Sequence, residues 1–292
     1  MNDIAITEHE FRQIVKLLKD NYGINLSQKK NLIVGRLHNH MRHYGFKSFS
    51  EFYDYVVCDR TGEAATLLIN KLTTNYTFFM REIEHFDYFR ATVLPNIVQA
   101  GRNRDRDMRI WSAGCSSGEE PYSIAMCIAD FFAGGGASVL PLHHSRLQNG
   151  VGRSGWDSKV LATDISDRVL TMATEGRYLA ESLETLPPAW RRAFFTPVDG
   201  ENEQVVDWLR QEIIFRKFNL MEARFPFRKG FHIIWCRNVM IYFDYETKKR
   251  LIDKFYDFTE PGGYLFIGHS ESISRKDTRY TYVMPAIYRR DR

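Results

Sequence analysis

Apolar residues recur at helical spacing through the first 90 residues, and four helices are predicted from them. Gly23 is expected to follow the first helix in a left-handed conformation, and Gly45 to end the second. Ser27 is expected to cap the second helix, and Ser48 or Ser50 the third. The apolar positions that define the four helices are Phe11, Val15, Leu17 and Leu18; Leu32, Ile33, Leu37 and Met41; Phe49, Phe52, Tyr53 and Val56; and Leu67, Leu68 and Leu72.

Beyond residue 108 the pattern changes to short apolar runs, each of a length that suits one buried strand. A longer helix, His85 to about Gln99, and a charged linker precede them. Two segments interrupt the alternation: a glycine-rich stretch over 133–158, expected to be a long surface loop, and a subdomain inserted over about 186–215. The expected strands are Ile110-Trp111, Lys159–Ile165, Ile213–Phe215, Phe231–Cys236 and Tyr264–Ile267.

A turn of small residues, Ser112 to Gly118, joins the first of these strands to a helix that begins near Glu119 and Glu120. A strand, a tight turn and a helix N-terminus hold nucleotide-like ligands at the carboxyl edge of parallel sheets. The three-glycine dinucleotide fingerprint is absent, and two carboxylates would repel a phosphate. S-adenosylmethionine fits this turn, because it has a ribose, an amino group and a sulfonium. An ordinary strand-to-helix turn is the alternative.

Two more segments carry candidate ligand groups. Asp164 ends the strand that follows the turn, where a ribose hydroxyl is bound in doubly wound folds; alternatively, it caps the helix through Val169 and Leu170. The segment 72–82 contains three threonines and an asparagine beside aromatic residues and one arginine. This composition is equally compatible with a capped loop and with the lining of a ligand cleft.

Basic residues gather on one side of the second helix: Lys29, Lys30, Arg36 and Arg42, together with His40 and His43. A charge run on a helix is most often a solvated face. The alternative is a docking surface for an acidic partner, because clustered cations raise encounter rates with anionic surfaces.

The composition excludes several classes of protein. A hydrophobic content of 44% is typical of soluble globular proteins, and a net charge of +4, from 40 Lys+Arg and 36 Asp+Glu, is too small to indicate nucleic-acid binding. Neither a signal pattern nor about 18 consecutive apolar residues occurs, so no membrane insertion is expected. The four cysteines are dispersed, which indicates reduced thiols and a cytoplasmic location. No metal is expected, since His143 and His144 lack a nearby carboxylate.

Over nearly its full length the chain resembles the chemotaxis receptor methyltransferases, the CheR family. Each matching stretch is weak alone, but their order and spacing together are specific. The stretches are Leu72-Thr-Thr-Asn-x-Thr with Arg81-Glu82, Ala113 to Met126, Ala162-Thr-Asp-Ile165, Asn219-Leu220, Cys236-Arg-Asn-Val-Met-Ile-Tyr-Phe-Asp244 and Gly262-Gly-Tyr-Leu-Phe-Ile-Gly-His-Ser-Glu271. Met80 departs from the family pattern, which often has a second phenylalanine there.

The resemblance implies an α/β fold, the Rossmann-like doubly wound sheet of class I methyltransferases, with an N-terminal all-α domain and a small inserted antiparallel β-subdomain. The expected boundaries are a helical domain over 1–90, a linker over 91–107 and a methyltransferase domain over 108–292 with the insert at about 177–212. The reaction implied is methyl transfer from S-adenosylmethionine to glutamate side chains of methyl-accepting chemotaxis receptors, giving 5-O-methyl esters and S-adenosylhomocysteine. The enzyme is expected to be a monomer.

The resemblance also assigns site residues, position by position. Arg81 and Tyr242 match the positions nearest the transferred methyl group, and the positions that line the cofactor site are Asn75, Thr77, Arg81, Glu120, Asp164, Asn219, Leu220, Arg237 and Asn238. The basic helix becomes a candidate for receptor docking through Lys29, Lys30, Arg36 and Arg42. The loop 196–203 lacks the glycine-rich insertion of members that bind a receptor's C-terminal pentapeptide, so docking independent of a pentapeptide is expected. Two rival classes are a methyltransferase for small molecules or nucleic acid, and a non-catalytic S-adenosylmethionine sensor.

Overall fold

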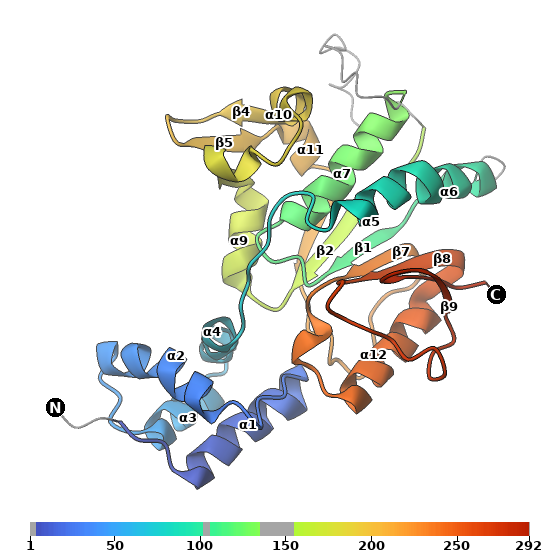
Figure 1. The fold of residues 1–292 in the computed structure, drawn as a ribbon. Coiled ribbons are helices and arrows are strands. Elements are labelled where there is room, and N and C mark those ends of the chain that lie inside the picture. The colour runs from blue at the N-terminus through green and yellow to red at the C-terminus, as the bar shows by residue number, and fades with distance from the viewer. Residues whose placement is uncertain (1–3, 102–105, 135–154, 292) are drawn as a thin grey trace.

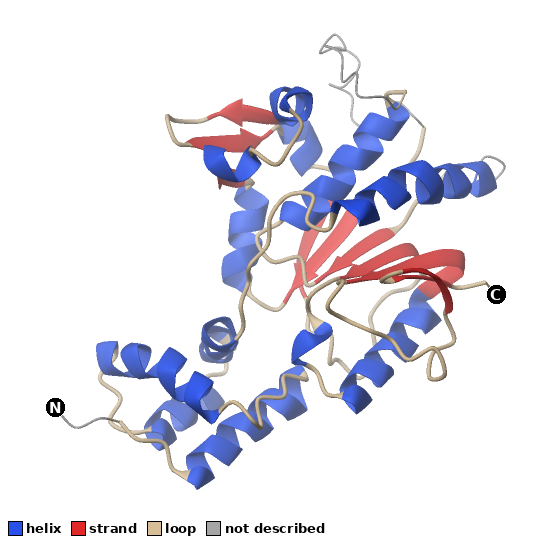
Figure 2. Cartoon of the chain, viewed as in Figure 1, coloured by secondary structure: helices blue, strands red, loops and turns tan. Residues whose placement is uncertain are grey.

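The structure, a computed structural model, describes residues 4–101, 106–134 and 155–291. Most of the glycine-rich segment, including His143 and His144, lies outside the described residues. Within them, no helix combines the length and apolarity that crossing a membrane requires. Four N-terminal helices form one part of the molecule, and a seven-stranded sheet with helices on both faces forms the other (Figures 1 and 2).

The N-terminal helices pack around a core of their own, in which Leu18, Leu37 and Phe52 are buried. Gly23 ends α1 in the left-handed conformation, with φ of 74°, as predicted. The Ser48 side chain caps α3 by accepting a hydrogen bond from the Glu51 N–H, also as predicted. The helices are α1 (Glu8–Tyr22), α2 (Lys30–His43), α3 (Phe49–Cys58) and α4 (Glu63–Leu72).

The predicted Ser27 cap is wrong. Lys29 is the residue that precedes α2, and its side chain makes no capping hydrogen bond. Ser27 instead donates its backbone N–H to the Asn25 carboxamide oxygen in a local turn. The Asn25 side chain thus satisfies the Ser27 N–H within a turn, and the helix begins three residues later, at Lys30.

The central sheet has the strand order β6-β2-β1-β7-β8-β10-β9. The strands from β6 to β8 are parallel, whereas β10 and β9 add to β8 as an antiparallel edge. The chain leaves β1 toward β2 on one side and later returns to β7 on the other, so the strand order reverses between β1 and β7. Ligands bind at such a reversal, beyond the carboxyl ends of the strands. The strands are β1 (Ile110–Ala113), β2 (Val160–Asp164), β6 (Ile213–Lys217), β7 (Phe231–Cys236), β8 (Thr259–Ile267), β9 (Thr281–Met284) and β10 (Ile287–Arg289).

Helices cover both faces of the sheet (Figure 1). One face packs against α5, α6 and α7, through residues such as Phe86, Leu94 and Ile128, and the other packs against α12 through Leu251 and Phe255. Burying apolar surface on both faces is what makes the central strands almost continuously hydrophobic. The helices are α5 (Ile83–Tyr88), a π-helical turn (Phe89–Val93), α6 (Leu94–Gly101), α7 (Glu119–Phe132), α9 (Asp167–Glu175) and α12 (Tyr245–Phe258).

Residues 91–101 of the expected linker are helical, in agreement with the helix expected from His85 to about Gln99. α5, the π-helical turn and α6 follow one another without a break. Val93 and Leu94 are fully buried in the core against the sheet. Residues 83–101 therefore pack as part of the α/β body.

A small three-stranded antiparallel sheet, in the order β3-β5-β4, lies beside α7 and α9 (Figure 1). Trp190 and Phe194 anchor it to the main core. Its elements are β3 (Arg177–Leu179), a 3-10 turn (Ala180–Leu183), α10 (Pro188–Phe194), β4 (Phe195–Pro197), β5 (Asn202–Val205) and α11 (Asp207–Arg210).

The N-terminal helices contact the α/β body next to a 3-10 turn, Met240–Tyr242. The Asn25 N–H donates to the Tyr242 carbonyl at 2.8 Å, and Lys19 pairs with Asp244 at 2.8 Å. The hydrogen bond from Lys19, together with the Thr247 N–H at the start of α12, lowers the pKa of Asp244 to about 2. The two parts of the molecule are thus joined at a segment that the sequence marks as part of the site.

Candidate active site

A cavity of about 340 Å³ lies at the strand reversal, between the carboxyl ends of β1 and β7 and the N-terminal helices. Volumes of this order are typical of small-ligand sites. All the residues expected at the cofactor and methyl-transfer positions line it: Asn75, Thr77, Arg81, Glu120, Asp164, Asn219, Leu220, Arg237, Asn238 and Tyr242. Residues from five separate segments of the chain therefore meet in one cavity.

The turn after β1 is held tightly against its neighbours. Gly114 has φ of 88°, and a Cβ atom there would overlap the Val239 side chain. The N–H groups of Gly114 and Cys115 both donate to the Thr163 carbonyl, at 2.8 and 2.9 Å. Ser116 has a left-handed φ of 49° and donates its N–H to Asp164 at 2.9 Å. Small residues are needed here because the backbone itself approaches both neighbouring strands.

Asp164 has each carboxylate oxygen fixed by a backbone donor, Oδ2 by the Ser116 N–H and Oδ1 by the Ser166 N–H at 3.0 Å. It does not cap the following helix, because Ser166 holds that position and accepts from Val169. Burial raises the pKa of the Asp164 carboxyl, and the backbone N–H donors oppose the rise. Its remaining lone pairs are available to a hydroxyl in the cavity.

Glu120 lies in the first turn of α7 and links two elements of the site. Its Oε1 accepts from the Ser112 hydroxyl at 2.7 Å, and its Oε2 pairs with Arg237 at 3.1 Å. Burial raises the pKa of its carboxyl, and the Arg237 guanidinium opposes this effect. Two partly buried carboxylates, Glu120 and Asp164, thus face one cavity.

Backbone groups of the segment 73–82 hold the side chains of Arg81, which belongs to this segment, and of Tyr242. Arg81 donates from Nη1 to the Tyr76 carbonyl at 2.7 Å, and its guanidinium lies about 6 Å from the Tyr76 and Phe78 rings. The Tyr242 hydroxyl oxygen accepts the Thr74 N–H at 2.9 Å. This bond leaves the hydroxyl hydrogen available to a ligand. The segment therefore lines a cleft, and Thr73 also caps α4 through the Ile69 carbonyl.

The amide side chains of the site are fixed by neighbouring backbone and side-chain groups. Asn219 donates to the Asn21 carbonyl at 2.8 Å and accepts from the Met221 N–H. Asn75 donates to Asn70 at 3.2 Å, and Asn238 adopts a left-handed φ of 60° after β7. Left-handed residues other than glycine are uncommon and concentrate at functional sites.

The N-terminal helices also contribute to the cavity wall, through Tyr22, Ile24, Ile69 and Asn70. Sequence patterns did not indicate this role, because Tyr22 and Ile69 follow the same helical spacing as the core positions around them. Their place in the site depends on how the two parts of the molecule pack.

Comparison with known proteins identifies the architecture. The family description "CheR methyltransferase, SAM binding domain" matches residues 75–288, and "CheR methyltransferase, all-alpha domain" matches residues 9–73. The chain belongs to the CheR methyltransferase family. Its α/β fold with an all-α N-terminal domain and a small antiparallel sheet is thereby confirmed.

Similar curated proteins cover nearly the whole CheR-family chain. A chemotaxis protein methyltransferase of Borreliella burgdorferi is 38% identical over 291 residues, covering 99% of this chain and 96% of the relative. A probable chemotaxis protein methyltransferase of Rhizobium etli is 37% identical, covering 88% and 90%. The chemotaxis protein methyltransferase of Escherichia coli is 34% identical, covering 98% and 92%. The chain is accordingly an S-adenosylmethionine-dependent methyltransferase.

The basic residues of α2 lie outside the CheR cavity and have distinct surroundings. Lys29 and Arg42 are exposed, and Lys30 pairs with Glu8 of α1. Arg36 extends to the segment that follows α4, where it donates to the Thr73 carbonyl at 2.9 Å and to the Thr74 hydroxyl at 3.1 Å. Arg36 therefore also supports the loop that holds Tyr242.

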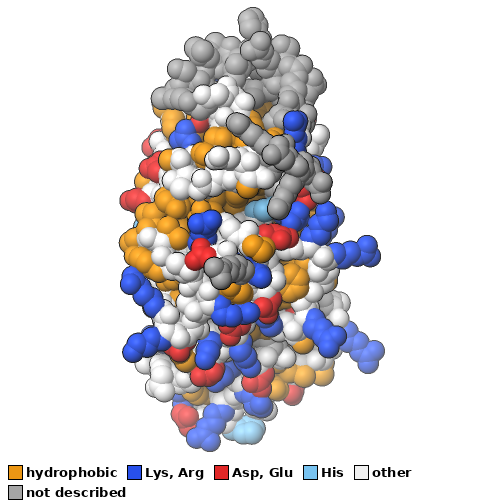
Figure 3. All heavy atoms as spheres, turned by 90° about the vertical axis from the view of Figure 1, so that its right-hand side faces the viewer, with side chains coloured by type: hydrophobic (Ala, Val, Ile, Leu, Met, Phe, Trp, Pro, Cys, Tyr) orange, Lys and Arg blue, Asp and Glu red, His pale blue; other side chains and the backbone are white. Residues whose placement is uncertain are grey.

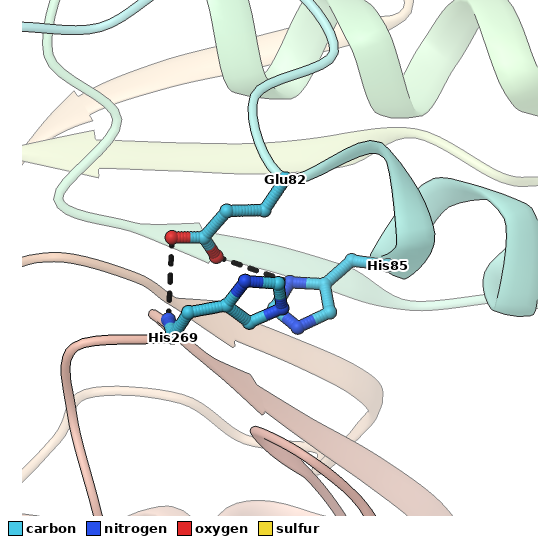
Figure 4. A group of neighbouring side chains, drawn as sticks. All are labelled: Glu82, His85 and His269. Carbon is cyan, nitrogen blue, oxygen red and sulfur yellow. Dashed lines mark hydrogen bonds and ion pairs between the residues drawn. The ribbon is translucent and has the colours of Figure 1, made fainter.

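Glu82, His85 and His269 meet at the edge of the CheR site (Figure 4). Glu82 accepts the His269 N–H at 3.2 Å and lies 3.4 Å from the His85 Nδ1. These residue types bind metal ions, but the Arg237 guanidinium already lies 3.0 Å from the Glu82 Oε2. A metal cation at Glu82 would be repelled by this fixed positive charge.

We expect His85 to make the CheR fold less stable in mild acid. Burial first, and the Arg237 charge second, lower its pKa from 6.5 to about 3, although Glu82 opposes the shift. Between these values the unfolded chain binds a proton that the folded chain does not, so folding weakens by up to about 1.4 kcal/mol per pH unit below about 6.5. Urea unfolding of the wild type and His85→Gln at pH 7.5 and 5.5 measures this. The wild type should lose about 1 kcal/mol more than the variant; equal losses would contradict the assignment.

Proposed function

We propose that this CheR-family enzyme transfers the methyl group of S-adenosylmethionine to glutamate side chains of chemoreceptors and forms glutamate 5-O-methyl esters. The observation that carries the proposal is that four side chains line one cavity: the carboxylates of Glu120 and Asp164, the Arg81 guanidinium and the Tyr242 hydroxyl. The curated relatives, all chemotaxis protein methyltransferases in name, support the receptor as the substrate.

The residues of the cavity fit the cofactor. Asp164 and Glu120 keep free lone pairs for hydroxyl or ammonium donors, and both suit the ribose and amino group better than a phosphate. Asn75, Thr77 and Asn219 add neutral polar groups, and Leu220 adds an apolar contact. When bound, S-adenosylmethionine supplies an electrophilic methyl group on a positively charged sulfur.

The side chains at the reacting end suit a carboxylate nucleophile. A glutamate with an ordinary pKa near 4.3 is already ionised at neutral pH, so no general base is required. Arg81 can hold that carboxylate by charge-assisted hydrogen bonds, and Tyr242 can donate its free hydroxyl hydrogen to it. Transfer neutralises a negative and a positive charge, so a dry, preorganised site favours it and catalysis is mainly positioning.

A nucleic-acid methyltransferase would require a basic stripe near the cavity. Figure 3 shows the side of the molecule that carries β9 and α12, and there Lys and Arg side chains lie among Asp and Glu side chains. The relatives, chemotaxis protein methyltransferases in name, favour a protein substrate. We propose that the surface that docks this substrate is formed by α2 and the residue before it, through Lys29, Lys30, Arg36 and Arg42.

Charge reversal on α2 tests receptor docking. The double reversal Arg36→Glu and Arg42→Glu should raise KM for receptors roughly tenfold and leave the affinity for S-adenosylhomocysteine intact, since exposed charges contribute up to about 1 kcal/mol each and act mainly on association. Alone, Arg42→Glu should change only KM, whereas Arg36→Glu should also lower kcat, because Arg36 supports Thr73 and Thr74. Receptor kinetics with calorimetry of the product complex separate these effects. Equal loss of both affinities would indicate misfolding instead.

The decisive experiment is methyl transfer from radiolabelled S-adenosylmethionine to membranes that contain the host's chemoreceptors, followed by alkaline release of the label as methanol. Base-labile label on the receptors is the expected result, because only carboxyl methyl esters are cleaved in this way. Cofactor binding without transfer to any receptor would favour the sensor class, and base-stable label would point to a different acceptor atom.

A further inference from the structure

Arg81 sits between two residues in left-handed backbone conformations. Met80 has φ of 56° and Glu82 has φ of 57°. Each costs of order 1 kcal/mol or more for a residue with a side chain, so the surrounding contacts must hold this segment in place. Met80 is anchored by its N–H, which donates to the buried Ser123 hydroxyl at 3.0 Å. The anchor on the other side of Arg81 is Glu82.

The Glu82 carboxylate connects three segments of the site. Oε1 accepts the His269 N–H at 3.2 Å (Figure 4). Oε1 also lies 3.4 Å from the Asn238 Nδ2, and Oε2 accepts from Arg237 at 3.0 Å. Its side chain is 14% exposed. Burial alone would raise the pKa of the Glu82 carboxyl, but the charge and hydrogen bonds of Arg237 and the hydrogen bond from the His269 N–H hold this pKa below its usual range.

Arg237 completes this connection and leads back to Arg81. Its side chain is 2% exposed, and its guanidinium donates to the Arg81 carbonyl, to Glu82 and to the Glu120 Oε2. It also lies 5.5 Å from the rings of Phe86 and Trp235. Because protein groups occupy its donors, Arg237 acts as a buried clamp between Glu82, Glu120 and the Arg81 backbone.

We propose that Glu82 is a positioning residue for methyl transfer: with Arg237, it holds the backbone of Arg81 so that the Arg81 guanidinium meets the substrate carboxylate. This inference rests on the proposed function for its kinetic readout. Glu82 does not itself line the cavity, and its effect on the reaction passes through Arg81. Small displacements of a positioned group can lower rates by about a hundredfold, so the supporting contacts matter even at a distance.

The test compares Glu82→Gln with Glu82→Asp and with the control Glu260→Gln. Glu260 pairs with Arg109 at 2.6 Å on the same sheet, at the strand ends away from the cavity, so it controls for the loss of a partly buried arginine–carboxylate pair. Glu82→Gln should lower kcat for receptor methylation at least about tenfold, with the Kd for S-adenosylhomocysteine changed by less than about threefold. Glu82→Asp should lower kcat less, because it keeps the charge.

A double-mutant cycle with Arg81→Ala separates positioning from general destabilisation. If Glu82 acts through Arg81, Glu82→Gln should cause less than about a twofold further loss of kcat in the Arg81→Ala background. Full additivity would overturn the proposal, and so would an unchanged kcat in Glu82→Gln alone. Binding of Co²⁺ or Zn²⁺ to the wild type that Glu82→Gln abolishes would overturn it too, because the trio would then be a metal site.

Hydrogen exchange provides a readout that does not depend on the substrate. The Thr74 and Met80 N–H groups are bonded to Tyr242 and Ser123, and both lie in the segment 73–82. Glu82→Gln should speed exchange in this segment at least about tenfold and leave exchange in β1 unchanged. The Glu260→Gln control should exchange like the wild type in both segments. Unchanged exchange in Glu82→Gln would overturn the positioning role. Failure of the wild type to methylate any receptor would refute the proposed function alone and leave the exchange result valid.

Discussion

Arg81→Ala is expected to lower kcat/KM for receptor methylation by about a hundred- to a thousandfold, or roughly 3 to 4 kcal/mol. Arg81 is the cationic residue of the segment 73–82, lines the cavity and is preorganised by its bond to the Tyr76 carbonyl. Removing it takes away the group that orients the incoming carboxylate, whereas the carboxylates at the cofactor end stay in place. The loss should therefore fall on kcat, with little change in the affinity for S-adenosylhomocysteine.

Initial rates of label transfer to receptor membranes, at varied receptor and cofactor concentrations, measure this effect. Arg224→Ala is a suitable control, because Arg224 is exposed and lies outside the cavity. Arg81→Lys separates charge from geometry: a lysine keeps the charge but loses the planar fork, and should recover only part of the rate. Wild-type turnover in Arg81→Ala would remove this residue from the reaction.

The sequence predicted those parts of the site that depend on local structure. A strand followed by small residues and two acids placed Glu120 at the helix start, and an acid at the next strand end placed Asp164 beside it, because parallel strands end at one edge. Gly23 and Ser48 could be predicted for the same reason, because their roles depend on local backbone. Gly23 adopts the left-handed conformation after α1, and Ser48 caps the start of α3.

Contacts between distant segments could not be predicted in this way. The cavity wall formed by Tyr22, Ile24 and Asn70 depends on how the helical part packs against the sheet. The Glu82–Arg237 pair joins residues 155 positions apart, and no spacing in the sequence announces it. The packing of residues 83–101 against the sheet could not be predicted either, because Val93 and Leu94 share a core with strands that follow much later in the chain.

Asp164→Asn is expected to weaken cofactor binding by roughly 30- to 100-fold, about 2 to 3 kcal/mol, which is the range for losing hydrogen bonds to a charged acceptor. In the wild type, the N–H groups of Ser116 and Ser166 each hold one carboxylate oxygen, and both oxygens keep lone pairs for a ribose hydroxyl. An asparagine would turn an amide N–H toward one of these backbone donors. The site would then lose both the charge and the fixed orientation.

Calorimetric titration with S-adenosylhomocysteine tests this loss, with Asp207→Asn as the control, since Asp207 is 81% exposed on α11 and lies outside the cavity. The pH dependence provides a second test. Because burial raises the pKa of Asp164, protonation should weaken binding by the wild type at a higher pH than for an ordinary aspartate, whereas the Asp164→Asn variant should lack this component. If Asp164→Asn bound as tightly as the wild type at neutral pH, the ribose would have to be held elsewhere. Glu120 would then be the remaining carboxylate among the described residues that line the cavity.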